Sequence, residues 1–335
     1  MAPRLILAVV LCLLPASIAL ADPAGPWQRA APSAWSDAAS RAVQAYAATH
    51  RPTAVMVVRD GLVVAAWGDV GRKVNLRSVR KSLIGMLYGI GVAEGRIDLS
   101  RTLEQLGIDD EPPALTQAEK RATLRDLLMA RSGVYHAAAY ETSDIRAKRP
   151  ARGSHPPGTF WFYNNWDFNV LGTIYRKVMG EDIFASFERR IAHPIGMEDF
   201  SAHDGRYVRE AVSIHPAYPF SMSARDLARF GLLVQERGRW NGRQIVPAAW
   251  IEQAAAALSA TDREGRGYGY LWWSLSSAQW GAGAALASGY GGQALAVVPS
   301  KHLVVVQTVD LEGGARGLRT TAFLALARAI ADGAP

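Results

Sequence analysis

The fold is decided by the stretch Arg77-Ser78-Val79-Arg80-Lys81-Ser82, which leads into an apolar run from Leu83 to Val92. Apolar residues recur through this stretch about every 3.6 positions, the spacing of one helix face. Glu94-Gly95 follows, and glycine readily adopts the left-handed conformation that ends a helix. The stretch therefore predicts a helix that starts close to the serine and stops before Gly95.

Ser78 and Lys81 lie three residues apart, so their side chains share one face of such a helix. A serine becomes a strong nucleophile only when a base removes its proton, and a neutral lysine amine one turn away can be that base. Backbone N–H groups in the first turn of a helix lack intrahelical partners and can point at a developing oxyanion. The pair is therefore a candidate nucleophile and base.

The same pair has an ordinary explanation, because Ser-x-x-Lys is a short pattern and both residue types are common on helix surfaces. Chance alone gives roughly 0.3–0.5 such pairs in a chain of this composition. The pattern by itself leaves both explanations open, and other parts of the chain have to decide between them.

The composition is that of an ordinary globular protein. The chain has 335 residues, of which 49% are apolar and 20% charged, enough for one large domain or two moderate ones. The formal net charge of +7 and the pI of about 9.6 could suggest nucleic acid or an anionic surface. The basic residues are spread along the chain without a Lys/Arg run or a nucleic-acid-binding motif, so we expect no nucleic-acid partner.

The first 21 residues have the pattern of a secretory signal peptide. Arg4 supplies the positive start, Leu5 to Leu14 the apolar segment, and Ala19-Leu20-Ala21 the small-x-small cleavage site. The apolar segment is short for a membrane span, and Leu11 before Cys12 is too large for a lipoprotein cleavage box. We expect cleavage after Ala21, no stable membrane anchor, and a periplasmic or secreted protein.

Cys12 is the only cysteine and lies inside the predicted signal peptide. The mature chain therefore needs no disulfide and cannot use cysteine for catalysis or metal binding. The seven histidines show no metal-ligand spacing, and there is no phosphate loop and no Gly-x-Ser-x-Gly elbow. The sequence predicts neither a metal nor a cofactor.

Strand-like segments lie near both ends of the chain. Residues 54–58 and 62–67 flank Asp60-Gly61, a strong hairpin signal, and residues 294–298 and 303–309 form a second hairpin. Another strand is expected at 268–275, and helices are expected at 34–50, around 124–128, and at 170–178, 184–191, 224–235, 247–258 and 319–330.

Strands at both ends with helices between them predict an α/β (α+β) fold. We expect an antiparallel sheet built from both chain termini and flanked by helices, plus a mostly helical subdomain. The mature chain, 22–335, is expected to form a single domain, with the sheet region at about 34–77 and 268–335 and the helical region at about 78–267.

Two further stretches are candidate parts of a site. Tyr163-Asn164-Asn165 follows a Pro-Pro-Gly turn, and a tyrosine near a lysine can act as acid or base if both pKa values fall below about 10. Aromatic packing is the alternative, since several aromatic residues surround this tyrosine. The glycines of Ser288 to Gln293 allow a backbone to approach a ligand closely, or simply form a tight entry to a strand.

Together the three stretches resemble the class C β-lactamase-related serine hydrolases, a family with penicillin-binding-protein-like, esterase and 6-aminohexanoate-dimer hydrolase branches. Ser78-Val79-Arg80-Lys81 resembles the family's Ser-x-x-Lys, and Tyr163-Asn164-Asn165 resembles its Tyr-x-Asn. Gly289-Tyr290-Gly291-Gly292-Gln293 resembles the glycine-rich strand entry that replaces Lys-Thr-Gly in the esterase and amide-hydrolase branches. The resemblance covers roughly residues 40–332, and three motifs in order are much more specific than one.

The resemblance implies a two-step acyl transfer on a β-lactamase/transpeptidase-like fold, which agrees with the sheet and helical subdomain expected above. Ser78 would attack a carbonyl carbon, and Lys81 and Tyr163 would together accept its proton and pass it to the leaving group. The backbone N–H groups of Ser78 and Tyr290 would form the oxyanion hole. Water would then release the acyl group from the serine.

The resemblance also implies residues that orient the substrate. Asn165 would orient Lys81 or a substrate amide, and Gly289 and Gly291 would let the substrate approach the strand. Aromatic residues could line an apolar acyl pocket, although core packing explains most of them equally well: Tyr135, Trp161, Tyr163, Trp166 and Tyr290.

The sequence departs from the family pattern at one informative place. No Lys or His heads the third motif, where β-lactamases and transpeptidases have the cation that meets the substrate carboxylate. This departure favours a small neutral ester or amide as the substrate over a β-lactam.

Three other functions stay open. The first is a D-amino-acid peptidase or β-lactamase that acts on cell-wall-like substrates. The second is a non-catalytic binding or sensor domain, which the intact Ser78, Lys81 and Tyr163 argue against. The third is an adhesin for anionic surfaces that depends on the positive charge. The sequence does not predict the oligomeric state.

Overall fold

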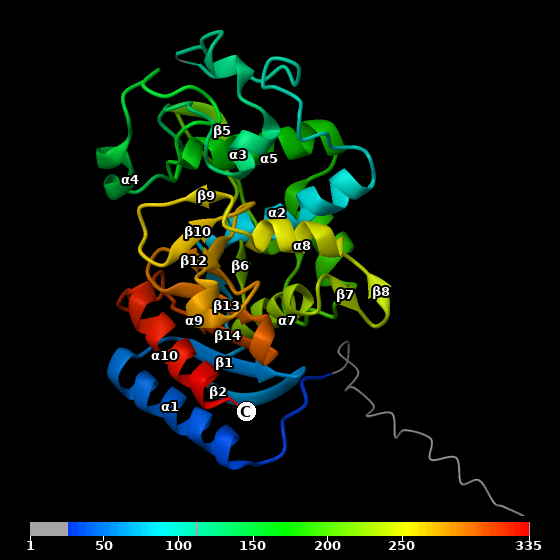
Figure 1. The fold of residues 1–335 in the computed structure, drawn as a ribbon, viewed down its shortest axis with the longest axis vertical. Helices are drawn as coiled ribbons and strands as arrows, with labels where there is room; N and C mark the ends of the chain where they lie inside the picture. The colour runs from blue at the N-terminus through cyan, green and yellow to red at the C-terminus, as the bar shows by residue number, and fades with distance from the viewer. Residues whose placement is uncertain (1–25, 112, 335) are drawn as a thin grey trace, which may run out of the picture.

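The computed structural model describes residues 26–111 and 113–334, so the predicted signal peptide lies outside the described residues. A large antiparallel sheet with helices on both faces occupies one part of the molecule, and a mostly helical region occupies the other (Figure 1). The predicted α/β architecture is confirmed: β1, near the start of the chain, pairs along its whole length with β14, near its end. Within the described part of the chain, no helix has the length and apolar character needed to cross a membrane.

The large sheet has eight strands in the order β2-β1-β14-β13-β12-β11-β10-β9. Their bounds are β1 Ala54–Arg59, β2 Leu62–Gly68, β9 Ser259–Ala260, β10 Arg266–Tyr268, β11 Trp273–Leu275, β12 Ala285–Gly289, β13 Gln293–Val298 and β14 Leu303–Thr308. Three small two-stranded pairs join β3 (Val74–Asn75) to β6 (Ser221–Met222), β4 (Val208–Glu210) to β5 (Ser213–Ala217), and β7 (Arg239–Trp240) to β8 (Arg243–Gln244).

The α-helices fall into a group that packs on the sheet and a group in the helical region. Their bounds are α1 Ala34–His50, α2 Val79–Ala93, α3 Leu124–Leu128, α4 Ser143–Lys148, α5 Asn165–Met179, α6 Ile183–Phe187, α7 Ala224–Gln235, α8 Ala248–Ala255, α9 Ser277–Trp280 and α10 Thr320–Gly333. Short 3-10 turns occur at Glu119–Arg121, Ala202–Asp204 and Pro299–Lys301, and a π-helical turn at Glu188–Ala192 continues from α6.

Helices cover the central strands of the sheet on both sides. In Figure 1, α1 and α10 lie side by side along one edge of the picture. Helix α1 packs against β2, and α10 packs against β13 and β14. Helix α7 packs against β1, β13 and β14 from the opposite layer. Every residue of β13 and β14 is buried, because strands covered on two faces need apolar residues at successive positions rather than at alternate ones.

The first hairpin follows from its turn residues. Asp60 has φ of 52° and Gly61 has φ of 77°, the two positive values that a type I′ turn requires. Aspartate tolerates this conformation and glycine adopts it without strain, which is why Asp-Gly was a strong hairpin signal.

Helix α2 runs through the middle of the molecule, between the sheet and the helical region (Figure 1), and nearly all of its residues are buried. Its glycines let neighbouring side chains approach the helix axis closely. A Cβ atom added to Gly89 would lie 2.4 Å from the indole ring of Trp250, and one added to Gly91 would lie 2.5 Å from Ile97. Close packing of this kind explains a glycine-rich helix that isolated propensities would disfavour.

The structure corrects some predicted boundaries. The expected strand at 268–275 is instead the hairpin of β10 and β11, which turns at Leu271 with φ of 63°. The predicted helix at 184–191 is α6 followed by the π-helical turn, and the helix predicted from 170 already begins at Asn165. The sheet also starts earlier than predicted, at Ser259. By contrast, α1 and α7 have the predicted ends, and Ser223 caps α7 by accepting from the N–H of Asp226.

Candidate active site

Ser78 lies at the junction between β3 and α2, where its side chain opens onto a cleft. It is the N-cap residue of α2, with φ of −73° and ψ of −13°, and its hydroxyl makes no capping hydrogen bond. The hydroxyl is therefore not used to hold the helix end. It stands at the positive end of the helix dipole, an environment that favours developing negative charge.

Lys81 lies one turn further along and contacts the serine directly. Its Nζ atom is 2.7 Å from Ser78 Oγ, and the side chain is 2% exposed. The amine also lies 4.6 Å from the ring centre of Tyr163 and 4.7 Å from that of Phe168. Among the described residues no carboxylate forms an ion pair with this lysine. An ammonium ion here would lack a compensating charge.

Tyr163 completes the predicted group. It precedes α5, whose N-cap Asn164 accepts from the backbone N–H of Trp166. The Tyr163 side chain lies close enough to that of Ser78 for the serine to influence its pKa, and its ring stacks on Trp273 at 5.4 Å between ring centres. The structure thus brings together the serine, lysine and tyrosine that the sequence placed in two separate motifs.

The two candidate bases have different electrostatic environments. Burial, with a smaller contribution from the positive charge of Arg80, holds the pKa of Lys81 well below its usual range. Burial raises the pKa of Tyr163 to about 12, and the neighbouring Ser78 side chain opposes that rise without overcoming it. The condition that both pKa values fall is therefore met by the lysine and not by the tyrosine. The environment favours a neutral lysine amine beside a protonated tyrosine.

The glycine-rich stretch packs directly against the nucleophile turn. Gly289 ends β12, and a Cβ atom added to it would lie 2.4 Å from the carbonyl oxygen of Leu76. Gly291 has φ of 77°, and a Cβ atom there would lie 2.3 Å from Leu311. Both positions need glycine, so the third motif is held beside the backbone that carries Ser78. Tyr290, between them, has a side chain that is 66% exposed.

Buried glutamines that the sequence did not single out hold this turn in place. The Gln293 amide donates to Val309 O at 2.6 Å, and its Oε1 accepts from Val309 N–H at 3.0 Å. Gln307 donates to Gly292 O at 2.8 Å, and its own Oε1 accepts from the Tyr46 hydroxyl at 2.6 Å. Both glutamines lie in otherwise apolar strands, where a polar residue is uncommon. That exception to the apolar pattern is the feature by which the sequence could have indicated their role.

A second set of polar contacts holds the residue before the serine. Arg77 has φ of 53°, an uncommon conformation for a residue other than glycine. Its N–H donates to Asn75 Oδ1 at 3.0 Å, and its guanidinium donates to the Tyr140 hydroxyl at 2.7 Å and lies 3.4 Å from Glu312. The Asn75 amide donates to the same hydroxyl and the same carboxylate, each at 2.9 Å. We refer to Asn75, Arg77, Tyr140 and Glu312 as the Arg77 brace.

The cleft above Ser78 has a volume of about 1160 Å³. Its walls include Tyr163, the turn at residues 288–291, the start of α10, and parts of the segment 142–160, which contains α4. Trp161 lines it as expected, and so do Gly289, Tyr290 and Gly291.

Three predicted orienting residues lie elsewhere. Trp166 is fully buried and donates its indole N–H to Asp110 at 2.7 Å, so it does not line the cleft. Tyr135 is also buried and contacts the His155 ring through its hydroxyl. Asn165 donates to Tyr140 O at 3.3 Å, and its Oδ1 has no hydrogen-bond partner, so it contacts the segment of the Arg77 brace rather than Lys81. Helix α5 carries Asn165 and Trp166 in its first turn, and neither side chain lines the cleft.

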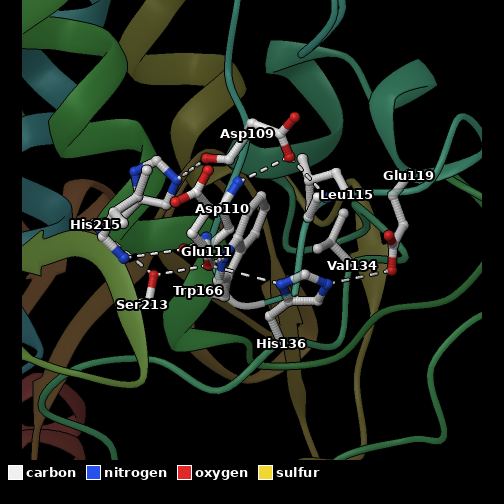
Figure 2. A network of polar contacts seen from close by, with 12 residues as sticks. Asp109, Asp110, Glu111, Leu115, Glu119, Val134, His136, Trp166, Ser213 and His215 are labelled. Atoms are coloured by element: carbon white, nitrogen blue, oxygen red, sulfur yellow. Dashed lines mark hydrogen bonds and ion pairs between the residues drawn. The ribbon is translucent and has the colours of Figure 1, made fainter.

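Trp166 instead belongs to a buried polar network in the helical region (Figure 2). Asp110 accepts from the Trp166 indole, from Ser213 Oγ at 2.8 Å and from Ile214 N–H at 2.9 Å. His136 lies between Asp110 and Glu119, with a ring nitrogen 3.6 Å from a carboxylate oxygen of each. Sequence reasoning missed this network because its members come from distant segments. The described residues contain no group of histidine and carboxylate side chains arranged to hold a metal.

An antiparallel sheet from both termini, with a buried Ser-Lys pair and a tyrosine at one end of a central helix, defines a β-lactamase/transpeptidase-like protein. The sequence matches the Beta-lactamase family over residues 39–329, most of its length, so the chain belongs to that family of serine hydrolases. A comparison with curated protein sequences found no match.

Solved structures share the fold at low sequence identity. A Bacillus anthracis protein assigned as a 6-aminohexanoate-dimer hydrolase has a TM-score of 0.72 and 21% identity, covering 92% of this chain and 87% of its own. EstCE1, a hydrolase with promiscuous acyltransferase activity, has a TM-score of 0.64 and 18% identity, with coverages of 89% and 100%. A penicillin-binding protein from Bacillus halodurans has a TM-score of 0.64 and 15% identity, with coverages of 86% and 99%. At these identities the likeness establishes the fold alone.

Proposed function

We propose that this protein is an exported serine hydrolase that cleaves a small ester or amide through an acyl-enzyme on Ser78. The observation that carries the proposal is the contact of 2.7 Å between Ser78 Oγ and the amine of Lys81, in a place where no carboxylate of the described residues pairs with the lysine. Burial lowers the pKa of Lys81, and only the neutral amine can accept the serine proton.

In the first step, Ser78 Oγ bonds to the substrate carbonyl carbon while its proton moves to Lys81 Nζ. The carbonyl oxygen becomes an oxyanion, which the backbone N–H groups of Ser78 and Tyr290 stabilise. Removing one such donor from an enzyme costs about 2.7–4 kcal/mol of transition-state stabilisation. The close packing of Gly289 against Leu76 supports this pairing, because it holds the two stretches side by side.

The tetrahedral intermediate then collapses, and the bond to the leaving alcohol or amine breaks. Tyr163, whose pKa of about 12 keeps it protonated, gives its proton to the leaving group and recovers one from the Lys81 ammonium. Water then attacks the acyl-enzyme and passes a proton to Lys81, and Lys81 returns this proton to Ser78 Oγ as the acyl bond breaks and the carboxylic acid leaves. The structural neighbours named as a 6-aminohexanoate-dimer hydrolase and as a hydrolase with promiscuous acyltransferase activity support this reaction class by analogy.

The test is the intact mass of the mature protein after brief exposure to a p-nitrophenyl ester and, separately, to a fluorophosphonate. We expect one adduct, located on Ser78 and absent from Ser78→Ala. Ser288→Ala is the matched control, because Ser288 lines the same cleft and should leave the adduct unchanged. No adduct on folded protein would refute the proposal and favour the binding-domain alternative.

The same samples address the alternatives and the export. Turnover of penicillins or D-alanyl peptides faster than of linear esters would favour the peptidase or β-lactamase alternative. N-terminal sequencing after expression of the full chain in a bacterial host should begin at Asp22 in the periplasm or medium. Retention of an intact N-terminus in the cytoplasm would contradict export.

A further inference from the structure

The wall of the cleft carries more positive than negative side chains. Five cationic residues line it, from four separate segments: Arg131, Lys148, Arg263, Arg266 and Arg319. Only two carboxylates, those of Asp144 and Asp262, line it with them. No local pattern marks this cluster, because its members are far apart along the chain.

The two carboxylates are already paired. Asp144 lies 2.9 Å from Lys148, its partner one helical turn away in α4, and Asp262 lies 3.4 Å from Arg263. No other acidic residue lines the cleft. Within residues 26–111 and 113–334, no ion pair joins a carboxylate to the remaining three arginines: Arg131, Arg266 and Arg319.

Arg266 is the most informative of the three. It is partly buried, and its guanidinium lies 5.5 Å from the ring centre of Trp273. Burial, together with the positive charge of Arg263, lowers the pKa of Arg266 and outweighs the opposing charge of Asp262, so the Arg266 charge stands in an unfavourable place. A guanidinium with unused donors beside a second cation is a site that an anion would stabilise.

Arg266 is also close to the reaction centre. The indole of Trp273 that it contacts stacks on the ring of Tyr163 at 5.4 Å. Although burial dominates the pKa of Tyr163 and raises it, the charge of Arg263 is among the influences that lower it. A substrate joined to Ser78 could therefore reach the arginines with a chain of a few atoms.

We infer that the cleft selects an ester or amide that carries a carboxylate, with Arg266 as its main contact and Arg131 and Arg319 as further cations of the same wall. This inference rests on the proposed function and names its substrate class. These arginines lie in the cleft wall. They are not part of the third motif, Gly289 to Gln293, where β-lactamases and transpeptidases have the cation that meets the substrate carboxylate. The anionic substrate replaces the neutral one that the missing cation had led us to expect.

The experiment compares esters that differ only in charge. Mono-p-nitrophenyl adipate and p-nitrophenyl hexanoate place a carboxylate or a methyl group at the end of acyl chains of equal length. The compound 3-acetoxybenzoate and its methyl ester place the charge on the leaving group instead. We expect wild type to show a kcat/KM ratio of anionic to neutral ester of about tenfold or more in at least one series, with uncatalysed hydrolysis subtracted. The ratio should fall as NaCl is raised to about 0.5 M, because salt screens partly exposed charges.

Arg266→Gln should lower that ratio about tenfold, and Arg319→Gln, at an exposed position, should lower it less. Arg243→Gln is the matched control, because Arg243 is exposed in β8 and does not line the cleft. It should leave both rates unchanged. If Arg266→Gln does not fold, as judged by thermal unfolding, Arg319→Gln and the salt series still test the inference.

The outcomes separate this inference from the proposed function. Hydrolysis of both esters with no preference for the anion in either series would overturn the substrate class and leave the hydrolase intact. A preference that survives both arginine substitutions would overturn the assignment of the binding residues. No hydrolysis of any ester, and no adduct at Ser78, would refute the proposed function itself.

Discussion

Lys81, beneath the cleft, and Asp110, in the helical region, are both buried ionisable groups, but their surroundings are opposite. Lys81 touches Ser78 and two aromatic rings, and the nearest charge that acts on it, Arg80, has the same sign. Asp110 accepts four hydrogen bonds from neutral donors and faces His136 (Figure 2). A charge on Lys81 has no partner of opposite sign among the described residues, whereas the charge on Asp110 is compensated by hydrogen-bond donors.

The pKa falls at both sites, with opposite consequences. Burial lowers the pKa of Lys81 and so favours the neutral amine, which is reactive. Burial alone would raise the pKa of Asp110, but the neighbouring His136 and the hydrogen bonds from Ile214, Trp166 and Ser213 outweigh it and lower that pKa, which keeps the carboxylate charged. The comparison suggests that this protein uses an uncompensated buried charge for chemistry and a compensated one for stability.

The largest expected effect is that of Lys81→Met, which removes the base while keeping most of the side-chain volume. We expect kcat/KM for ester hydrolysis to fall about 10³-fold, since a positioned base contributes about 10²–10⁴. We also expect the free energy of unfolding at pH 7 to rise by about 1 kcal/mol, because the variant no longer buries an ionisable amine. Lys177→Met, at an exposed position, is the control for both measurements.

The lowered pKa of Lys81 predicts how the stability gain of Lys81→Met changes with pH. The folded-state pKa of Lys81 is lowered, so below the unfolded value near 10.5 the lysine costs stability, and the gain in Lys81→Met should shrink as the pH approaches 10.5. The acylation rate of wild type should rise with pH and level off well below 10.5. Because the pKa of Tyr163 is about 12, its ionisation should not lower the rate before that pH. An inflection at the ordinary lysine pKa would contradict the argument.

Asp110→Asn tests the compensated site and should have the next largest effect. Removing one partner of a buried charged pair typically costs 3–5 kcal/mol, and we expect about 3 kcal/mol here, since asparagine keeps some of the hydrogen bonds. The lowered folded-state pKa means that the Asp110 contribution is present above the unfolded value of 3.8 and is lost as the pH falls through the folded value. Urea unfolding at pH 7 and at about pH 2.5, between the unfolded and folded values, measures both effects. A loss below 1 kcal/mol at pH 7 would mean that the network is not stabilising.

The two sites also differ in how far the sequence predicts them. Ser78 and Lys81 are three residues apart on one helix, so periodicity alone placed them together. Asp110, His136 and Ser213 come from three segments that only the fold brings together, and no local pattern marks them. Trp166 was misplaced for the same reason, since motif spacing fixes its position along α5 but not the side of the helix that faces the cleft.

The sheet shows the same limit. The ends of α1 and α7 follow from their caps, which are local. The turn at Leu271 interrupts an apolar run, so the sequence alone favoured one strand where the structure has β10 and β11. The pairing of β1 with β14 was inferred only because strand signals occurred at both ends of the chain.

Tyr140→Phe addresses the backbone that carries Ser78, and its expected effect is smaller. The hydroxyl accepts from both Arg77 and Asn75, and its loss should loosen the strained turn at Arg77 without removing any group that touches the substrate. We expect kcat to fall about tenfold with KM nearly unchanged, because small displacements of reacting groups are costly. Tyr207→Phe, which loses a hydroxyl contact to Asp182, is the control. A change confined to KM or to thermal stability would contradict a positioning role for the Arg77 brace.

The smallest expected effect concerns charges that remain in water. Arg328 and Asp332 form an ion pair of 2.6 Å one turn apart in α10, and their side chains are 39% and 57% exposed. Exposed pairs of this kind contribute roughly 0.3–0.5 kcal/mol, and Asp332 lies near the negative end of the helix dipole, which opposes that gain. Asp332→Asn should therefore change the free energy of unfolding by less than about 0.5 kcal/mol, with no change in kcat/KM. The same Asp-to-Asn change would then be compared at an exposed site and in the buried network of Figure 2. A loss of unfolding free energy as large as that of Asp110→Asn would show that burial does not explain the difference between the two sites.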